Sequence, residues 1–145
     1  MSRPIYETRG DIANEERALK AIESRSKKRG VKLPMSYRMD YAMTTENKEI
    51  TSWIEVKTRK HKKGKYETLA IGLNKLMAGI ALEERTKLPF FLIIAWDDFI
   101  GYIRISSLEG FKITMGGRTD RDDDQDQEPM VHIPVDQFKE LKAAK

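Results

Sequence analysis

Two carboxylates and one lysine lie close together in the sequence of this 145-residue chain. They are Asp40, Glu55 and Lys57, within the stretch M-D-Y-A-M-T-T-E-N-K-E-I-T-S-W-I-E-V-K. Mg²⁺ prefers hard oxygen ligands and is usually held by one or two carboxylates, with water and substrate phosphate completing its octahedron. A bound ion polarises a phosphate and lowers the pKa of an attacking water, while an adjacent amine can orient that water. These residue types therefore suit metal-assisted hydrolysis of a phosphate ester.

A predicted β-hairpin would bring the three residues together. Residues 36–43 and 50–57 are rich in strand formers and are separated by the polar turn T-T-E-N-K-E. The two-residue period of a strand puts Glu55 and Lys57 on one face, and pairing brings Asp40 beside them. The opposite face is apolar and holds Met39, Tyr41, Met43, Ile54 and Val56. An ordinary solvent-facing side is the alternative interpretation, although two carboxylates and an amine near strand ends are unusual on such a side.

A third carboxylate lies on a predicted helix from Asp11 to Lys28. Spacings of three and four residues place one stripe of this helix at Ile12, Glu15, Leu19, Ile22 and Ser26. A carboxylate on an apolar stripe is unfavourable unless it faces a group that needs it. Glu15 is therefore a candidate member of the same site.

The remaining elements are predicted from periodicity and from Gly and Pro positions. A second helix from Leu73 to Thr86 ends before Pro89, and the apolar run F-F-L-I-I-A-W that follows is typical of a buried strand. The other expected elements are strands at Tyr102–Ile105, Lys112–Met115 and Met130–Ile133, and a short helix at Asp136–Leu141. The pattern indicates an α/β domain with a mixed central sheet, a helix on one face, the second helix packed nearby and an added hairpin at Phe90–Ile105.

Length and composition fit one compact domain, residues 1–145. No apolar run approaches the length of a membrane span, and no cysteine is present, so we expect a cytoplasmic protein of a bacterium or a phage-infected host with no membrane partner. The net charge of +4 favours a polyanionic partner. An acidic loop near 117–129 is expected to be solvated, and the alternative is that it binds a second cation.

Glu15, Asp40 and Glu55-Val56-Lys57, in this order, resemble the pattern of the PD-(D/E)XK nuclease superfamily, the restriction-endonuclease-like and Holliday-junction-resolvase-like group. That pattern has an acidic residue on a first helix, an Asp at a strand, (D/E)-X-Lys on the next strand, and then a helix and a strand. The resemblance covers roughly residues 11–94. Members often have Pro before the first Asp, and this chain has Met39 instead.

The resemblance implies a restriction-endonuclease-like mixed sheet flanked by helices, and it implies roles for the motif residues. Asp40 and Glu55 would bind Mg²⁺ or Mn²⁺ together with the backbone carbonyl of Val56, and Lys57 would serve catalysis. Glu15 would support the metal directly or through water. A shift of one residue along the helix would give this role to Glu16 instead.

A run of basic residues follows Lys57 in the sequence T-R-K-H-K-K-G-K. Such a run can neutralise phosphates without reading base sequence, and its contribution falls with salt. The candidate nucleic-acid-binding residues are Arg59, Lys60, Lys62, Lys63 and Lys65, joined by Lys75 at the start of the second helix. A solvated turn with ordinary lysines is the alternative.

Together these features predict a metal-dependent deoxyribonuclease that hydrolyses DNA phosphodiester bonds. Its small size favours an endonuclease of structure-directed or low sequence specificity, in DNA repair, recombination or phage DNA processing. Exonuclease activity also fits the same residues. The alternatives are a non-catalytic nucleic-acid-binding or assembly subunit that retains the fold, and an enzyme acting on RNA. A homodimer would suit a two-fold symmetric substrate.

Overall fold

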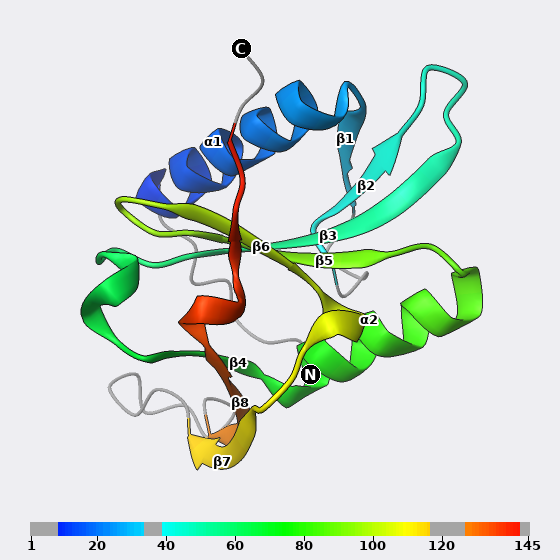
Figure 1. The fold of residues 1–145 in the computed structure, drawn as a ribbon. Helices are drawn as coiled ribbons and strands as arrows, with labels where there is room; N and C mark the ends of the chain where they lie inside the picture. The colour runs from blue at the N-terminus through cyan, green and yellow to red at the C-terminus, as the bar shows by residue number, and fades with distance from the viewer. Residues whose placement is uncertain (1–8, 34–38, 117–126, 143–145) are drawn as a thin grey trace.

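The computed structural model describes residues 9–33, 39–116 and 127–142, and a six-stranded mixed sheet forms its centre (Figure 1). The strand order is β1-β2-β3-β5-β6-β9. These strands are β1 (Arg29–Lys32), β2 (Tyr41–Thr44), β3 (Ile50–Thr58), β5 (Phe90–Ala95), β6 (Ile100–Arg104) and β9 (Lys139–Glu140). Strands β3 and β5 run parallel, and every other neighbouring pair in this sheet is antiparallel. The predicted mixed central sheet is confirmed.

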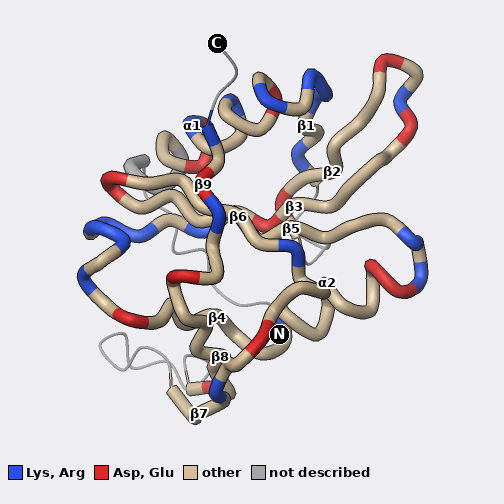
Figure 2. Tube along the Cα trace, in the orientation of Figure 1, with Lys and Arg blue, Asp and Glu red and all other residues tan. Residues whose placement is uncertain are grey.

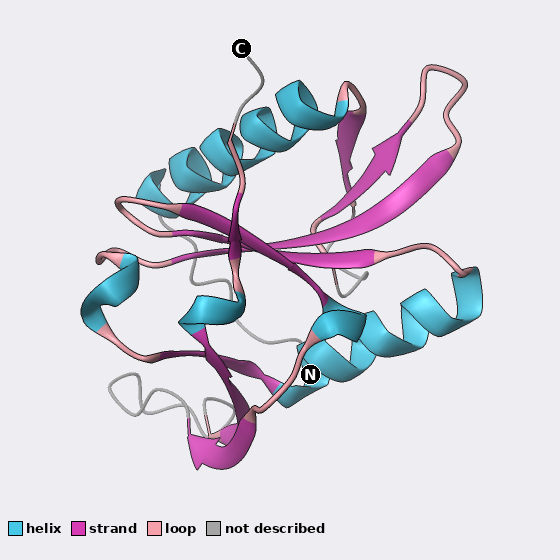
Figure 3. Cartoon of the chain, viewed as in Figure 1, coloured by secondary structure: helices cyan, strands magenta, loops and turns pink. Residues whose placement is uncertain are grey.

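Two helices cover opposite faces of this sheet (Figure 3). Helix α1 (Arg9–Ser26) contacts β3 and β5 on one face, and α2 (Leu73–Thr86) packs on the other. A smaller antiparallel sheet of order β4-β8-β7 lies on the α2 side and is formed by β4 (Thr68–Gly72), β8 (Glu128–Pro134) and β7 (Lys112–Gly116). Within the described ranges, neither helix combines the length and the apolar character that crossing a bilayer requires.

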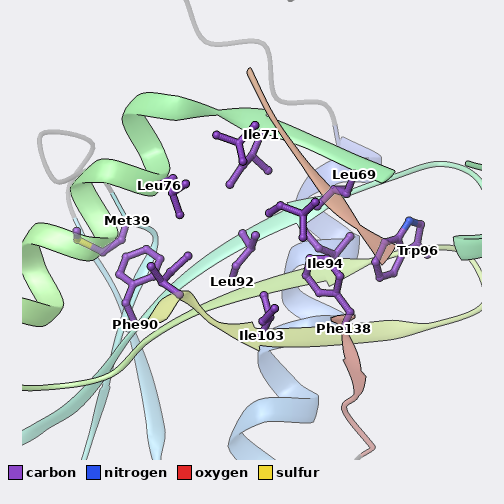
Figure 4. Packing of buried hydrophobic residues seen from close by; sticks show 13 residues of the cluster. Met39, Leu69, Ile71, Leu76, Phe90, Leu92, Ile94, Trp96, Ile103 and Phe138 are labelled. Atoms are coloured by element: carbon purple, nitrogen blue, oxygen red, sulfur yellow. The ribbon is translucent and has the colours of Figure 1, made fainter. Parts of the chain in front are cut away.

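The two faces of the central sheet each contribute to a hydrophobic cluster. The larger cluster lies between this sheet, α2 and the small sheet, and it includes Phe90, Leu92, Ile94 and Trp96 (Figure 4). The second cluster joins the α1 face to Ile93 and other apolar side chains. Because strand β5 is buried on both faces, its sequence is continuously apolar rather than alternating, as predicted for a buried strand.

The predicted hairpin is confirmed as the antiparallel pair β2 and β3, with Tyr41 opposite Ile54. The predicted apolar face is also found, since Tyr41 and Ile54 belong to the α1-side cluster. Met39 is the exception, because it packs with Phe90 in the α2-side cluster. Strand β2 begins only at Tyr41, so the two-residue alternation does not extend back to Met39. The polar face is not a solvent-facing side, since Glu55 is only 3% exposed there.

Several predicted boundaries and one predicted element differ from the structure. Helix α1 begins at Arg9 and ends at Ser26, so it is displaced by two residues towards the N-terminus. Strands β1 and β4 were not expected, and the pair β5–β6 belongs to the central sheet rather than being an added hairpin. Most of the predicted acidic loop lies outside the described residues, and Glu128 begins strand β8.

The predicted helix at Asp136–Leu141 is wrong. Residues Val135–Gln137 form one turn of 3-10 helix, and β9 then pairs with β6, with Glu140 opposite Gly101. The ring of Phe138 packs against that of Trp96 with centroids 5.4 Å apart. This contact with the larger cluster holds the segment extended, and it overrides a helical preference that is weak over six residues.

Candidate metal-binding active site

Asp40 lies immediately before β2, where hydrogen bonds fix it between its two neighbouring strands. Its amide donates to the Ile54 carbonyl at 2.9 Å, and its own carbonyl accepts the Leu33 amide at 2.8 Å. The Val56 amide donates to Asp40 Oδ2 at 2.7 Å, so the carboxylate lies beside the peptide that follows Glu55. Burial raises the pKa of Asp40 despite this hydrogen bond, and the charge of Glu15 adds to the increase. The carboxylate is therefore rigidly placed and carries a charge that the surroundings only partly stabilise.

Glu55 is a buried carboxylate on β3 that is short of hydrogen-bond donors. Among the described residues, its Oε1 atom accepts no hydrogen bond. Burial and, to a smaller extent, the neighbouring charge of Asp40 together raise the pKa of Glu55 to about 7, against the opposing effect of the nearby lysines. An unsatisfied buried carboxylate oxygen beside a second carboxylate is unfavourable in the protein alone. The pair would be stabilised by a positive charge between them.

Two ammonium groups flank the Glu55 carboxylate from different elements. Lys57 Nζ lies 3.5 Å from Glu55 Oε2, and Lys75 Nζ lies 3.6 Å from Glu55 Oε1. Lys57 follows Glu55 by two residues on the same face of β3, as the strand period predicts. Lys75 comes from the first turn of α2, which begins directly after β4. The structure thus brings Lys75 to the carboxylate site itself.

Glu15 is buried on α1 and belongs to a separate hydrogen-bonding group. Its Oε1 atom accepts the Tyr41 hydroxyl at 2.7 Å and the Lys32 ammonium at 2.6 Å. Glu16, the residue that a one-position shift would select, is exposed. The prediction that Glu15 faces inward from the helix therefore agrees with the structure. Its connection to Asp40 is indirect, because Lys32 Nζ also lies 3.7 Å from Asp40 Oδ1.

Sequence reasoning did not identify Lys32 and Tyr41 as members of the site. Lys32 lies on β1, a four-residue strand with three exposed positions, and such a strand has no apolar periodicity to reveal it. Tyr41 was counted only as an apolar residue. Its place directly after Asp40, facing the helix that carries Glu15, is the signal that could have suggested a hydrogen bond.

The carboxylates fit a hard divalent cation, although fewer of them converge than expected. Within the described ranges, no group of three or more His, Asp or Glu side chains is arranged to hold a metal. Asp40 and Glu55 supply two carboxylates, and Mg²⁺ is usually bound by one or two. Glu55 Oε1, which accepts no hydrogen bond from the described residues, and the pKa values of both carboxyl groups, which burial raises, are consistent with a site that a cation would stabilise.

The basic loop after β3 divides into residues with different roles. The Arg59 guanidinium is turned inward, where it donates to the Thr58 carbonyl at 2.8 Å and to the Ala70 carbonyl at 2.9 Å. It therefore ties β3 to β4, which differs from the predicted contact with phosphate. Lys63 and Lys65 lie over the rings of Phe99 and Tyr66. The exposed lysines of this loop are Lys60, Lys62 and Lys65.

The sequence and the fold can both be compared with known proteins. Residues 1–141 match the family model described as "Phage putative PDDEXK endonuclease". No curated protein matches the sequence. The fold is similar to the 1.6 Å structure of Archaeoglobus fulgidus Hjc, a Holliday junction resolvase from an archaeal hyperthermophile, with 14% sequence identity and a TM-score of 0.59. The similarity covers 91% of this chain and 92% of that chain. At this identity it confirms the predicted fold, and the family match confirms the sequence resemblance.

Proposed function

Because this chain belongs to the phage PDDEXK endonuclease family, we propose that it hydrolyses DNA phosphodiester bonds with the help of Mg²⁺ or Mn²⁺. The observation that carries the proposal is the carboxylate pair of the partly buried Asp40 and the buried Glu55, with two lysines beside Glu55 and one Glu55 oxygen that accepts no hydrogen bond from the described residues. We further propose an endonuclease of structure-directed or low sequence specificity, acting in DNA repair, recombination or phage DNA processing in the bacterial cytoplasm.

Asp40, Glu55 and the backbone carbonyl of Val56 would hold the ion. When bound, the ion would supply positive charge to the scissile phosphate and lower the pKa of a nearby water. Asp40 is held ready for this task by the Val56 amide, so little reorganisation is needed on binding. A bound ion would in turn stabilise the charged forms of these carboxylates, which burial disfavours.

The two lysines near Glu55 have complementary tasks in the proposed mechanism. Lys57 is one-third exposed, so its ammonium can reach a water or a phosphate oxygen while staying near Glu55. Lys75, on α2, lies on the other carboxylate oxygen and would stabilise negative charge that develops on the phosphate. Glu15 acts as a positioning residue, since it holds Lys32 beside Asp40.

Several features support DNA as the substrate. The loop after β3 leaves the strand next to Lys57, so its exposed lysines Lys60 and Lys62 lie close in sequence to the proposed site. The structural neighbour is described as a Holliday junction resolvase, which supports branched DNA as a substrate to test first. A four-way junction has two-fold symmetry, so we propose that cleavage of paired strands would use a homodimer.

The test is nicking of supercoiled plasmid and cutting of a synthetic four-way junction in Mg²⁺. Glu55→Gln and Lys57→Met are expected to lower the cleavage rate by at least about 100-fold, while EDTA abolishes cleavage and Mn²⁺ restores it. Glu16→Gln and Lys87→Met make the same chemical changes at exposed positions and should cleave normally. Cleavage that survives at Glu55 and Lys57 would contradict the proposed site.

Binding of DNA without any cleavage would instead favour a non-catalytic nucleic-acid-binding or assembly subunit. Faster cleavage of single-stranded RNA than of DNA in the same assay would favour an RNA-directed enzyme. Both outcomes are distinguishable from loss of folding, because the melting temperature of each variant can be measured separately.

A further inference from the structure

A basic groove lies beside the proposed active site, at the edge of the sheet formed by β1. Its volume is about 1140 Å³, and it lies between the C-terminal end of α1, strand β1 and the β2–β3 turn. Figure 2 shows Lys and Arg gathered where α1 ends and β1 begins. The cationic lining residues are Lys27, Lys28, Arg29, Lys32 and Lys48, and the anionic ones are Glu23 and Glu46. The lining therefore carries an excess of positive charge.

One of the two carboxylates in the groove is already engaged. Glu23 Oε2 accepts the backbone amide of Gly30 at 2.9 Å, which holds the start of β1 to α1. Among the described residues, neither Lys27 nor Lys48 forms an ion pair, and both are exposed. Their charges are thus available to a ligand that lies in the groove.

Two of these lysines occupy backbone conformations that normally favour glycine. Lys27 has φ of 58° and Lys48 has φ of 65°. A side chain at positive φ is uncommon, and Gly or Asn relieves the strain. Lys27 directly follows the end of α1, where a positive charge interacts favourably with the helix dipole. Lys48 lies in the turn between two strands, where no helix dipole acts, so that explanation does not apply to it.

The groove adjoins the proposed active site through Lys32 and Leu33. Ala42 lines the groove and stands two residues after Asp40 in the sequence. Leu33, another lining residue, donates its amide to the Asp40 carbonyl. Lys32 connects the groove with the proposed active site, since it lines the groove and its ammonium lies 3.7 Å from Asp40 Oδ1. A DNA strand bound in the groove would therefore lie close to Asp40.

We propose that this groove, with Lys27 and Lys48 on its two sides, binds the phosphate backbone of the DNA arm that leads to the scissile phosphate. The inference rests on the proposed function and adds a second contact region to the loop after β3. The two regions lie at opposite ends of β3, because Lys48 precedes this strand and the loop follows it. DNA held at both would run along β3, the strand that carries Glu55.

The test is binding of a labelled four-way junction and of a matched duplex in EDTA, between about 50 and about 200 mM salt. Lys27→Gly and Lys48→Gly each remove one charge without introducing backbone strain. If each lysine contacts one phosphate, the negative slope of the logarithm of the association constant against the logarithm of the salt concentration becomes shallower by about 0.9 in each variant. The affinity of each variant then falls by up to about eightfold at 0.1 M salt. The double variant is expected to lose up to about sixtyfold.

Lys87→Gly is the matched control, because Lys87 also has positive φ, at 61°, but ends α2 away from the groove. It should bind DNA with the wild-type slope. All three variants are expected to melt at or above the wild-type temperature. If a glycine variant melts lower, the corresponding asparagine variant, which also tolerates positive φ, must reproduce the loss of affinity.

If Lys27→Gly and Lys48→Gly bind DNA as tightly as the wild type, the groove does not bind DNA, and the proposed nuclease activity is unaffected by that result. An equal loss in Lys87→Gly would also overturn it, because any surface charge would then suffice. Absence of wild-type DNA binding at every salt concentration would overturn the proposed function itself. A wild-type preference for RNA that depends on the same two lysines would identify RNA as the occupant.

Discussion

Glu55→Gln is expected to stabilise the metal-free protein at neutral and alkaline pH. The substitution keeps the shape of the side chain and removes a charge that burial and Asp40 make unfavourable. The pKa of Glu55 is raised from an ordinary value of 4.5 to about 7. At about 1.36 kcal/mol per pH unit, this increase corresponds to about 3 kcal/mol of the free energy of unfolding.

The sign follows from which state holds the proton. Below pH 4.5 the carboxyl group is protonated in both states, so Glu and Gln behave alike. Between pH 4.5 and about 7 the unfolded chain releases its proton while the folded protein keeps it. Wild-type stability therefore falls across this window relative to the variant, and the full difference is present above about pH 7.

The assay is urea denaturation in EDTA at several pH values, with the free energy of unfolding extrapolated to water. Glu16→Gln is the control, because it removes a glutamate charge from an exposed position. Mg²⁺ is expected to raise the stability of the wild type more than that of Glu55→Gln, since binding to the folded state alone is stabilising. A Glu55→Gln protein that is less stable than wild type at pH 8, or a difference that does not vary with pH, would refute the reasoning.

Three further perturbations test the surrounding structure. Tyr41→Phe removes the hydroxyl that donates to Glu15, and chemical denaturation should show a loss of about 1.5–3 kcal/mol. Gly79→Ala is expected to destabilise by about 1–3 kcal/mol despite better helix propensity, because a Cβ there would lie 3.0 Å from the buried Phe90 ring; an unchanged or higher melting temperature would contradict this. Arg59→Met should lower the melting temperature, because the carbonyls of Thr58 and Ala70 each lose a hydrogen-bond donor. A variant that melts normally but binds DNA weakly would show that the guanidinium contacts phosphate instead.

Local sequence patterns determined most of the elements and the order of the motif. The second helix was predicted with the bounds that α2 has, because its apolar spacing is regular and Pro89 follows its end. The β2–β3 hairpin and the common face of Glu55 and Lys57 follow from the two-residue period alone. Helical periodicity favoured Glu15 and left Glu16 as an alternative, and the structure buries Glu15 and exposes Glu16.

Short elements could not be predicted from local sequence patterns, because their conformation depends on partners distant in sequence. Strand β1 has no apolar pattern of its own and exists because it pairs with β2. The C-terminal segment is extended because β9 pairs with β6, and because Phe138 packs against Trp96. Neither contact leaves a periodic signal within the segment.

For the chemistry of the site, the sequence determined some features and the tertiary structure determined others. The sequence by itself determined which residue types could bind a metal and activate water, because those properties belong to the side chains. Only the tertiary structure decided that Lys75 reaches Glu55, and that Lys32 stands between Glu15 and Asp40. The increase in the pKa of Glu55 also depends on the tertiary structure, because folding buries the carboxylate and brings the charge of Asp40 near it.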